Sequence, residues 1–299
     1  MSDRPPEVSI VLPTHNGAKY IRQSIDSCLS QSYRDIELII VDDCSDDDTP
    51  AIIASYRDER IKYIRHKEKQ GVAAALNSGF SKARGKYLTW TSDDNFYSPV
   101  AIEVLARALE SRRKVDFVYA DFYKIDEKAK IICPTKVLHS DELNVSNSIG
   151  PCFLYRKSIY EQVGDYNPGL ILIEDYDYWL RVRERFRMER INQTLYYYRI
   201  HKESLSAKYA REEVLRRAEN LKEKYLSFHI AGYPYARKQF YKKNYAEAKR
   251  ALLKCLPSQF FNPVAWRMLV MMCLGARSTT FVRMIKTAIW RENNTIEEY

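Results

Sequence analysis

Short apolar runs alternate with helix-like patterns along the first 123 residues of the chain. Each run is four to eight residues long, is rich in β-branched or aromatic residues, and ends at a turn or polar loop, as a buried strand does. The predicted strands cover residues 8–12, 36–41, 61–64, 87–90 and 116–123. Apolar residues recur at helical spacing between them, over residues 21–29, 49–56, 72–83 and 99–110. This alternation predicts βαβ units and a mostly parallel α/β sheet flanked by helices.

The pattern changes twice farther along the chain. From about Lys124, polar segments separate a strand over residues 152–155, a helix over about 176–186 and a strand over 195–200. Beyond Ala207, charged and amphipathic helical patterns follow, over residues 211–228, 241–256, 262–274 and 280–290. The sequence therefore predicts an α/β domain of residues 1–207 and an α-helical C-terminal extension of residues 208–299.

The net charge of +9 lies in this extension. Residues 211–299 carry 17 Lys and Arg against 8 Asp and Glu, so the rest of the chain is balanced. A basic surface with Trp266 and Trp290 suits peripheral contact with an anionic membrane. Helices that cap the α/β domain or form a dimer contact are the alternative. No nucleic-acid recognition motif accompanies the charge, so no nucleic-acid partner is expected.

No targeting or membrane-spanning segment is recognisable in the sequence. Residues 1–7 lack a basic and apolar signal, and no run of about 18 apolar residues occurs. The six cysteines show neither metal-ligand nor disulfide spacing, which favours reduced thiols. We expect a cytoplasmic protein, with peripheral contact at the inner face of the membrane through residues 208–299.

Two adjacent carboxylates directly follow the predicted strand over residues 87–90. Asp93 and Asp94 thus lie at the carboxyl end of that strand, where open α/β sheets bind their ligands. The polar loops 13–16 and 42–47 follow two other strands and should converge on the same edge. Turn chemistry alone explains an isolated Asp-Asp-Asn sequence, but three converging polar loops indicate a binding crevice.

The residue types in these loops suggest how a phosphate ligand is bound. No glycine-rich phosphate loop occurs, so recognition would depend on a cation and on loop amides. Asp93 and Asp94 suit Mg²⁺ or Mn²⁺, which prefer carboxylate oxygens and bridge diphosphates. Asp43 is placed to accept hydrogen bonds from a base or ribose. Asp175 could remove a proton from a hydroxyl nucleophile, although the helix dipole also explains acids in a first helical turn.

These motifs form an ordered set along the chain. The segments are Val8–Asn16, Ile39–Asp47, Gly71–Asn77, Thr91–Asp94 and Glu174–Asp177, with a His-x-x-Ser at His201 and Ser204. Over residues 8 to about 204, the chain resembles the family 2 glycosyltransferases, which have the GT-A fold. The resemblance implies a Rossmann-like sheet with a nucleotide-binding part of about residues 1–123. It also implies an acceptor part of about residues 124–207.

The resemblance also implies which residues bind the donor, a nucleoside diphosphate sugar. Those that would contact the nucleotide are Pro13, Thr14, Asn16 and Asp43. Those that would lie at the diphosphate are Asp93, His201 and Ser204.

The implied reaction is an inverting sugar transfer to a hydroxyl of a glycan or of a lipid-linked acceptor. Asp93 and Asp94 would hold the divalent metal, Mg²⁺ or Mn²⁺, and Asp175 would be the general base. One position departs from the family pattern, because Thr91 replaces the first aspartate of the Asp-x-Asp-Asp loop. The absence of a Gln-x-x-Arg-Trp segment disfavours a processive polysaccharide synthase.

Two other functions are compatible with the same motifs. A nucleotidyltransferase of similar fold would make the sugar nucleotide, but such enzymes carry a basic glycine-rich loop after the first strand, and residues 14–17 are not one. A catalytically weak protein that only binds nucleotide sugars is the second alternative, prompted by Thr91.

Overall fold

The computed structural model describes residues 4–144, 146–207, 209, 211–225, 239–240 and 244–255. Contacts between residues divide the chain into two compact units, Met1–Leu221 and Lys222–Tyr299. The first unit therefore includes the α/β domain and extends beyond residue 207 into helix α7 (Arg211–Tyr225). In the second unit, helix α9 (Tyr245–Cys255) agrees with the helix predicted over residues 241–256. The helices predicted over residues 262–274 and 280–290 lie outside the described residues.

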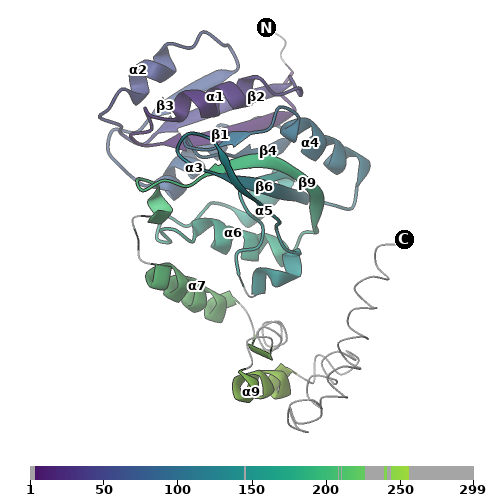
Figure 1. Ribbon diagram of the computed structural model, residues 1–299. Helices are drawn as coiled ribbons and strands as arrows, with labels where there is room; N and C mark the ends of the chain where they lie inside the picture. Colours follow the sequence, from purple (N-terminus) through teal and green to yellow (C-terminus); the bar gives the residue numbers. More distant parts are fainter. Residues whose placement is uncertain are drawn as a thin grey trace. The chain divides into compact units, whose positions relative to one another are not determined.

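The strands and helices predicted between residues 8 and 200 are present, with shifted ends (Figure 1). The strands are β1 (Val8–Thr14), β2 (Ile36–Asp42), β3 (Ile61–Arg65), β4 (Tyr87–Trp90), β5 (Phe96–Tyr97), β6 (Phe117–Ile125), β7 (Ile131–Thr135), β8 (Cys152–Arg156) and β9 (Met188–Arg199). The helices of the sheet region are α1 (Ile21–Leu29), α2 (Thr49–Ala54), α3 (Val72–Phe80), α4 (Ala101–Ser111), α5 (Lys157–Val163) and α6 (Glu174–Arg183). Short 3₁₀ turns are η1 (Ser140–Asn144) and η2 (Leu205–Ala207). Periodicity did not predict β5, β7 or α5.

The strands form one mixed sheet in the order β3-β2-β1-β4-β8-β6-β9-β5, with β7 paired to β6. β1 is parallel to both β2 and β4, and β2 is parallel to β3. β8 is antiparallel to both β4 and β6, so β6 and its parallel partner β9 run in the same direction as β4. The strands β3, β2, β1, β4, β6 and β9 therefore end at one edge of the sheet. The predicted α/β architecture is confirmed, with β5, β7 and β8 as the reversed strands.

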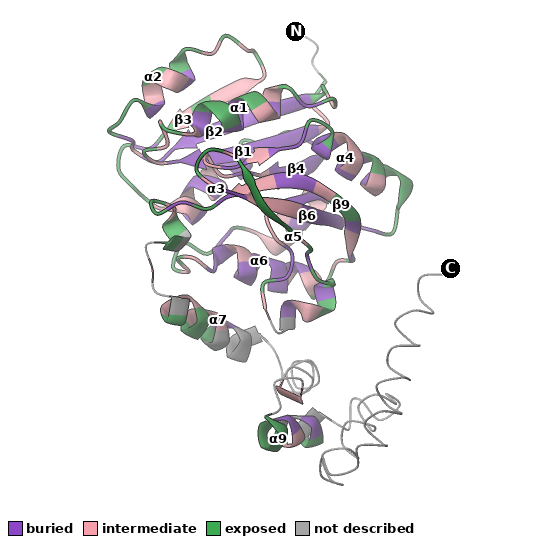
Figure 2. Ribbon diagram, viewed as in Figure 1, coloured by how far each residue is buried: buried purple, intermediate pink, exposed green. Residues whose placement is uncertain are grey.

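Alternate side chains of the central strands point to opposite faces of the sheet, as the pleat requires. On one face, Ile10 and Leu12 of β1 join a buried cluster that includes Ile25 of α1 and Leu105 of α4. On the other face, Val11 lies against α3. Figure 2 shows the resulting pattern of buried central strands and an exposed β7.

Aromatic side chains fill the second face beneath α6. The Trp179 ring of α6 meets Phe153 of β8 with ring centroids 4.7 Å apart and Phe117 of β6 at 5.0 Å. The ring centroid of Phe80, at the end of α3, lies 6.2 Å from that of Tyr155 of β8. The aromatic contacts thus join α3 and α6 across the same face of the sheet.

Two further features bear on the sequence-based expectations. Cys28, Cys44, Cys133 and Cys152 are free thiols, as the scattered cysteine spacing predicts. Among the described residues, no helix combines the length and the apolar character needed to cross a bilayer.

Helix α3 approaches β1 closely because residue 79 carries no side chain. A Cβ atom at Gly79 would lie 2.4 Å from Cγ1 of Val11 and 3.2 Å from Cγ2 of Val41. Both valines belong to central strands that cannot move without disturbing the sheet. The spacing of helix and sheet therefore requires glycine at this position.

Gly79→Ala should lower the free energy of unfolding by about 1 to 3 kcal/mol, the usual effect of overpacking a core. Urea unfolding measures the difference in free energy of unfolding between the variant and the wild type. Gly169→Ala is the matched control, because its added carbon would meet only the side chain of Asn167, at 3.3 Å. A stabilised Gly79→Ala variant, as helix propensity alone predicts, would contradict this packing.

Candidate functional site

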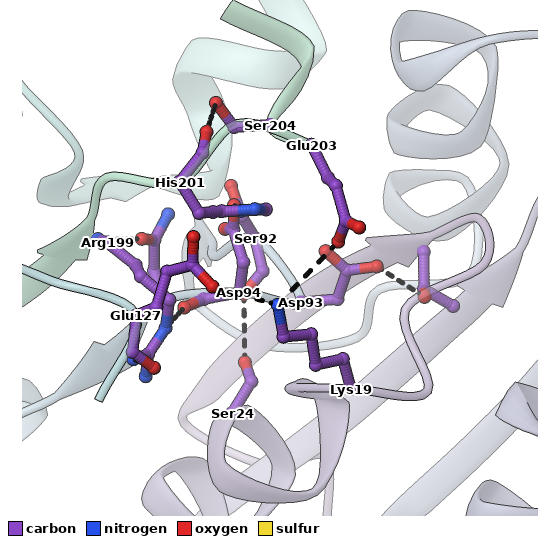
Figure 3. Close-up of polar contacts among 12 residues, drawn as sticks. Lys19, Ser24, Ser92, Asp93, Asp94, Glu127, Arg199, His201, Glu203 and Ser204 are labelled. Carbon is purple, nitrogen blue, oxygen red and sulfur yellow. Dashed lines mark hydrogen bonds and ion pairs between the residues drawn. The ribbon is translucent and has the colours of Figure 1, made fainter. Parts of the chain in front are cut away.

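The candidate site lies where β1, β2 and β4 end side by side. Their adjacent positions and common direction bring together the loops that follow Thr14, Asp42 and Trp90. β9 runs in the same direction, so the segment after it reaches the same edge. Figure 3 shows Asp93 and Asp94 between α1 and the segment that follows β9.

Asp93 is held by the end of β1. Thr14 Oγ1 donates a hydrogen bond of 2.6 Å to Asp93 Oδ2. Residue 17 is glycine at the point of closest approach, because a Cβ there would lie 2.3 Å from Asp93 Oδ2 and 2.6 Å from Thr14 Oγ1. The structure therefore brings the predicted residues Thr14 and Asp93 together and shows that Gly17 permits it.

Asp94 is held by the segment after β9. His201 Nε2 lies 2.9 Å from Asp94 Oδ2, and Ser204 Oγ donates to the His201 carbonyl at 3.0 Å. Asp94 Oδ1 is buried and has no hydrogen-bond partner among the described residues. The predicted residues Asp94, His201 and Ser204 thus form one cluster that contains an unsatisfied carboxylate oxygen.

The two carboxylates affect each other's ionisation. Burial, and next the charge of Asp94, raise the pKa of Asp93 to about 7, although the hydrogen bond from Thr14 acts in the opposite direction. A divalent cation would offset both effects, since it supplies the opposite charge and a partner for the buried Asp94 oxygen. The described residues contain no cluster of three or more His, Cys, Asp and Glu suited to a metal. Mg²⁺ commonly binds through one or two carboxylates plus phosphate oxygens, so Asp93 and Asp94 fit such an ion.

Thr91, which replaces the first aspartate of the family pattern, belongs to the core. Its side chain is fully buried, and its Oγ1 lies 2.7 Å from the hydroxyl of Tyr196 on β9. The threonine therefore packs beneath the acidic loop.

Asp43 is buried and already has several protein partners. Its Oδ1 accepts from the Gln70 amide at 2.9 Å and lies 2.7 Å from His66 Nδ1, while Oδ2 accepts from the Gly71 amide at 2.7 Å. His66 Nε2 in turn lies 2.9 Å from Ser78 Oγ of α3. The carboxylate therefore holds the loop before α3 in place, and its predicted contact with a nucleotide stays a prediction.

The other predicted nucleotide residues differ in accessibility. Pro13 is buried within β1, whereas Asn16 is exposed in a left-handed backbone conformation with φ of 58°. Asn16 Nδ2 donates to Asp46 Oδ1 at 2.6 Å, and the Asp46 amide donates to Asn16 Oδ1 at 2.9 Å. Asn16 thereby joins the loop after β1 to the loop after β2, and nucleotide contact by either residue stays a prediction.

Asp175 lies in the first turn of α6, which begins at Glu174 and thus earlier than the sequence pattern indicates. The Tyr176 amide donates to Asp175 Oδ1 at 2.7 Å, and Asn147 Nδ2 donates to Oδ2 at 2.7 Å. Burial raises the pKa of Asp175. Burial and the charge of Asp175 raise the pKa of Glu174 to about 8. The side chain of Glu174 is buried, and its Oε2 lacks a partner among the described residues, whereas both oxygens of Asp175 accept hydrogen bonds.

A chain of aromatic contacts links α6 to the strand that precedes the acidic loop. Trp90 Nε1 donates to the Tyr166 hydroxyl at 3.2 Å, and Tyr166 stacks on Tyr178 of α6 with centroids 4.0 Å apart. The side chain of Asn77 of α3 binds the backbone of Tyr166. Its Nδ2 donates to the Tyr166 carbonyl and its Oδ1 accepts from the Tyr166 amide, both at 2.8 Å. The helix that bears Asp175 is therefore fixed to the end of β4.

Three residues of the site were not predicted from the sequence, namely Gly17, Tyr166 and Arg199. Arg199 is 2% exposed, and its Nε donates to the carbonyl of Asp94 at 2.9 Å. The sequence signal for Arg199 is a charged residue at the end of an apolar, aromatic strand. Arginine is rarely buried unless its guanidinium has partners. No local pattern marks Tyr166 or the contact of Gly17 with Asp93.

Known proteins resemble this chain in sequence and in fold. Residues 9–164 match the family model described as glycosyl transferase family 2. An Escherichia coli protein, the UDP-Glc:alpha-D-GlcNAc-diphosphoundecaprenol beta-1,3-glucosyltransferase WfaP, is 32% identical over 220 residues, which cover 72% of this chain and 85% of that protein. The structure of Staphylococcus aureus TarS 1-349 in complex with UDP-GlcNAc has a TM-score of 0.64 at 17% identity and covers 84% of this chain and 80% of that one.

Other relatives are considerably longer than the matched region. An uncharacterized glycosyltransferase of Rickettsia felis is 37% identical over 190 residues, which are 59% of this chain and 31% of that protein. The chain likewise spans 27% and 58% of the related proteins of Rickettsia bellii and Rickettsia prowazekii. The match to more than half of the chain, together with the similarity to WfaP over most of both sequences, shows that the protein belongs to glycosyl transferase family 2.

Proposed function

We propose that the protein is an inverting, metal-dependent glycosyltransferase that moves a sugar from a nucleoside diphosphate donor to a hydroxyl of a glycan or lipid-linked acceptor. The observation that carries the proposal is the cluster of Thr14, Asp93, Asp94 and His201, with an unsatisfied buried oxygen, at the edge where the parallel strands end. The TarS structures with UDP and UDP-GlcNAc support a nucleotide sugar as donor. The acceptor of WfaP, alpha-D-GlcNAc-diphosphoundecaprenol, supports a sugar-diphosphate lipid as acceptor.

Asp93 and Asp94 would hold the metal, Mg²⁺ or Mn²⁺. When bound, such an ion supplies positive charge that stabilises the departing diphosphate, without a proton donor from the protein. Thr14 and His201 orient the two carboxylates, and Gly17 leaves room for Asp93 beside β1.

Asp175 would act as the general base. It takes the proton from the acceptor hydroxyl while that oxygen attacks the anomeric carbon, and the bond to the diphosphate breaks on the opposite side of the sugar. The raised pKa of Asp175 strengthens it as a base. The Tyr176 amide and Asn147 hold its carboxylate in one orientation. A single inversion needs no covalent intermediate and no second nucleophile.

The membrane contact predicted through residues 208–299 stays a prediction. Most of this extension lies outside the described residues, and its described helices supply no test of where the acceptor lies.

Asp175→Asn should lower the rate of transfer by about 10²- to 10⁴-fold, the usual contribution of a general base. Binding of UDP should not change, because the substitution removes a charge from the acceptor side of the proposed site. Transfer is measured with UDP-, GDP- and dTDP-sugars onto sugar-diphosphate lipids and soluble glycans. Glu184→Gln, an exposed acid just beyond the end of α6, is the matched control and should keep full activity. If Asp175→Asn transfers sugar at the wild-type rate, Asp175 is not the general base.

Asp93 should make the metal-free protein less stable as the pH rises. Its folded pKa of about 7 lies above the value of about 4 for an unfolded aspartate, so its stabilising contribution is complete below about pH 4 and is lost as the pH rises through 7. Asp93→Asn keeps an oxygen that accepts the hydrogen bond from Thr14, but its amide does not ionise. At pH 8 in EDTA it should therefore raise the free energy of unfolding by about 1 to 3 kcal/mol.

Urea unfolding at pH 4 and pH 8 measures this difference, and the exposed residue Asp48 provides the control variant Asp48→Asn. Mn²⁺ with UDP should stabilise the wild type more at pH 8 than at pH 5, because metal and proton compete for the same carboxylates. Equal pH dependence of Asp93→Asn and wild type would contradict the assignment.

A further inference from the structure

Arg199, the last residue of β9, makes four side-chain hydrogen bonds to three separate segments. Its Nε donates to the Asp94 carbonyl at 2.9 Å. Its Nη1 donates to the carbonyls of Asp126 and Glu127 at 3.0 and 2.9 Å, and its Nη2 donates to Gln23 Oε1 at 2.6 Å. One guanidinium thus joins the acidic loop, the turn between β6 and β7, and helix α1. Figure 3 shows Arg199 beside Asp94 and Glu127.

The backbone of Arg199 also holds the acidic loop. Its amide donates to Asn95 Oδ1 at 2.7 Å, and Asn95 is itself buried. Asp94 and Asn95 are consecutive, so Arg199 fixes the loop at two neighbouring points. The carboxylate of Asp94 can then occupy few positions relative to His201.

The charge of Arg199 is not neutralised by an ion pair. Within the described part of the chain, no carboxylate lies at ion-pair distance from the guanidinium, whose hydrogen bonds go to carbonyl and amide oxygens. The group is 4.5 Å from the ring centroid of Tyr20 and 5.9 Å from that of Phe96. Because a charge acts more strongly where water is excluded, this cation stabilises the negative charge of Asp94.

The turn between β6 and β7 has a second attachment. Lys19 Nζ, beside α1, lies 3.0 Å from Glu127 Oε2 and 3.8 Å from Glu203 Oε2. This ion pair is exposed and therefore weak. The buried contacts of Arg199 are the ones that keep the turn next to the acidic loop.

We propose that Arg199 is a positioning residue that holds the acidic loop and the turn between β6 and β7 as one unit. The proposal rests on the proposed function insofar as the loop binds metal and diphosphate. Only the planar fork of arginine reaches all four acceptors, because a lysine ammonium is a compact group with three donors.

The test compares Arg199→Lys, which keeps the charge and loses the fork, with Arg199→Met, which loses both. Arg190→Lys is the matched control. Arg190 also lies on β9 and is half-buried, and its Nη2 lies 2.7 Å from Asp121 Oδ2. It stands near the start of β9, whereas Arg199 stands at the end beside the acidic loop. Mn²⁺ binding in the presence of UDP should weaken by about 10- to 100-fold in Arg199→Lys, as when other groups that orient metal ligands are replaced. It should weaken further in Arg199→Met and stay unchanged in Arg190→Lys.

Hydrogen exchange of the 299-residue chain without metal provides a readout that does not depend on metal binding. Residues 91–98 and 126–130 should exchange faster together in Arg199→Lys, while the central strands keep wild-type protection. Should the Arg199 variants fail to fold, Gln23→Ala removes one acceptor from an exposed position and should weaken Mn²⁺ binding by about five-fold.

The outcomes separate this proposal from the proposed function. Faster exchange in only one of the two segments, or wild-type Mn²⁺ affinity in Arg199→Lys, would overturn the role of Arg199. If the wild type binds no Mn²⁺ with UDP, the metal assignment fails. The joint exchange of the two segments then still decides whether Arg199 unites them.

Discussion

Repulsion between two neighbouring carboxylates is the constraint around which this edge of the sheet is arranged. Asp93 and Asp94 are adjacent in the chain and partly shielded from water, a placement that is unfavourable without compensation. Two segments supply this compensation. Thr14 lies at the end of β1, and Arg199 and His201 lie at the end of β9 and just beyond it. The positions of Thr14, Arg199 and His201 are thus explained by the need to stabilise two adjacent negative charges.

Strand direction determines which segments can meet this requirement. β8 is reversed relative to both of its neighbours, so β6 resumes the direction of β4, and β9 follows it. The ends of strands from both halves of the domain therefore reach the same edge. A residue near position 200 can contact one near position 94 because a single antiparallel strand separates the two parallel groups.

Hydrophobic periodicity predicted the long strands and helices because each buries a continuous face. It did not predict β5 or β7, since β5 has two residues and β7 is an exposed strand with no apolar alternation. The acidic pair, Thr14 and His201 were predictable because they stand at strand ends. The partners of Asp43 were not, since His66 and the Gln70 and Gly71 amides approach it only through the tertiary fold.

The burial of Thr91 also limits how the acidic loop can vary. The position faces Tyr196 in the interior, so an aspartate there would be a buried charge with a phenol as its neighbour. An aspartate at this site would place its charge against the hydroxyl that now pairs with threonine. The core beneath the loop therefore limits which residue can stand at position 91. Thr91 and Tyr196 form a hydrogen-bonded pair in the interior.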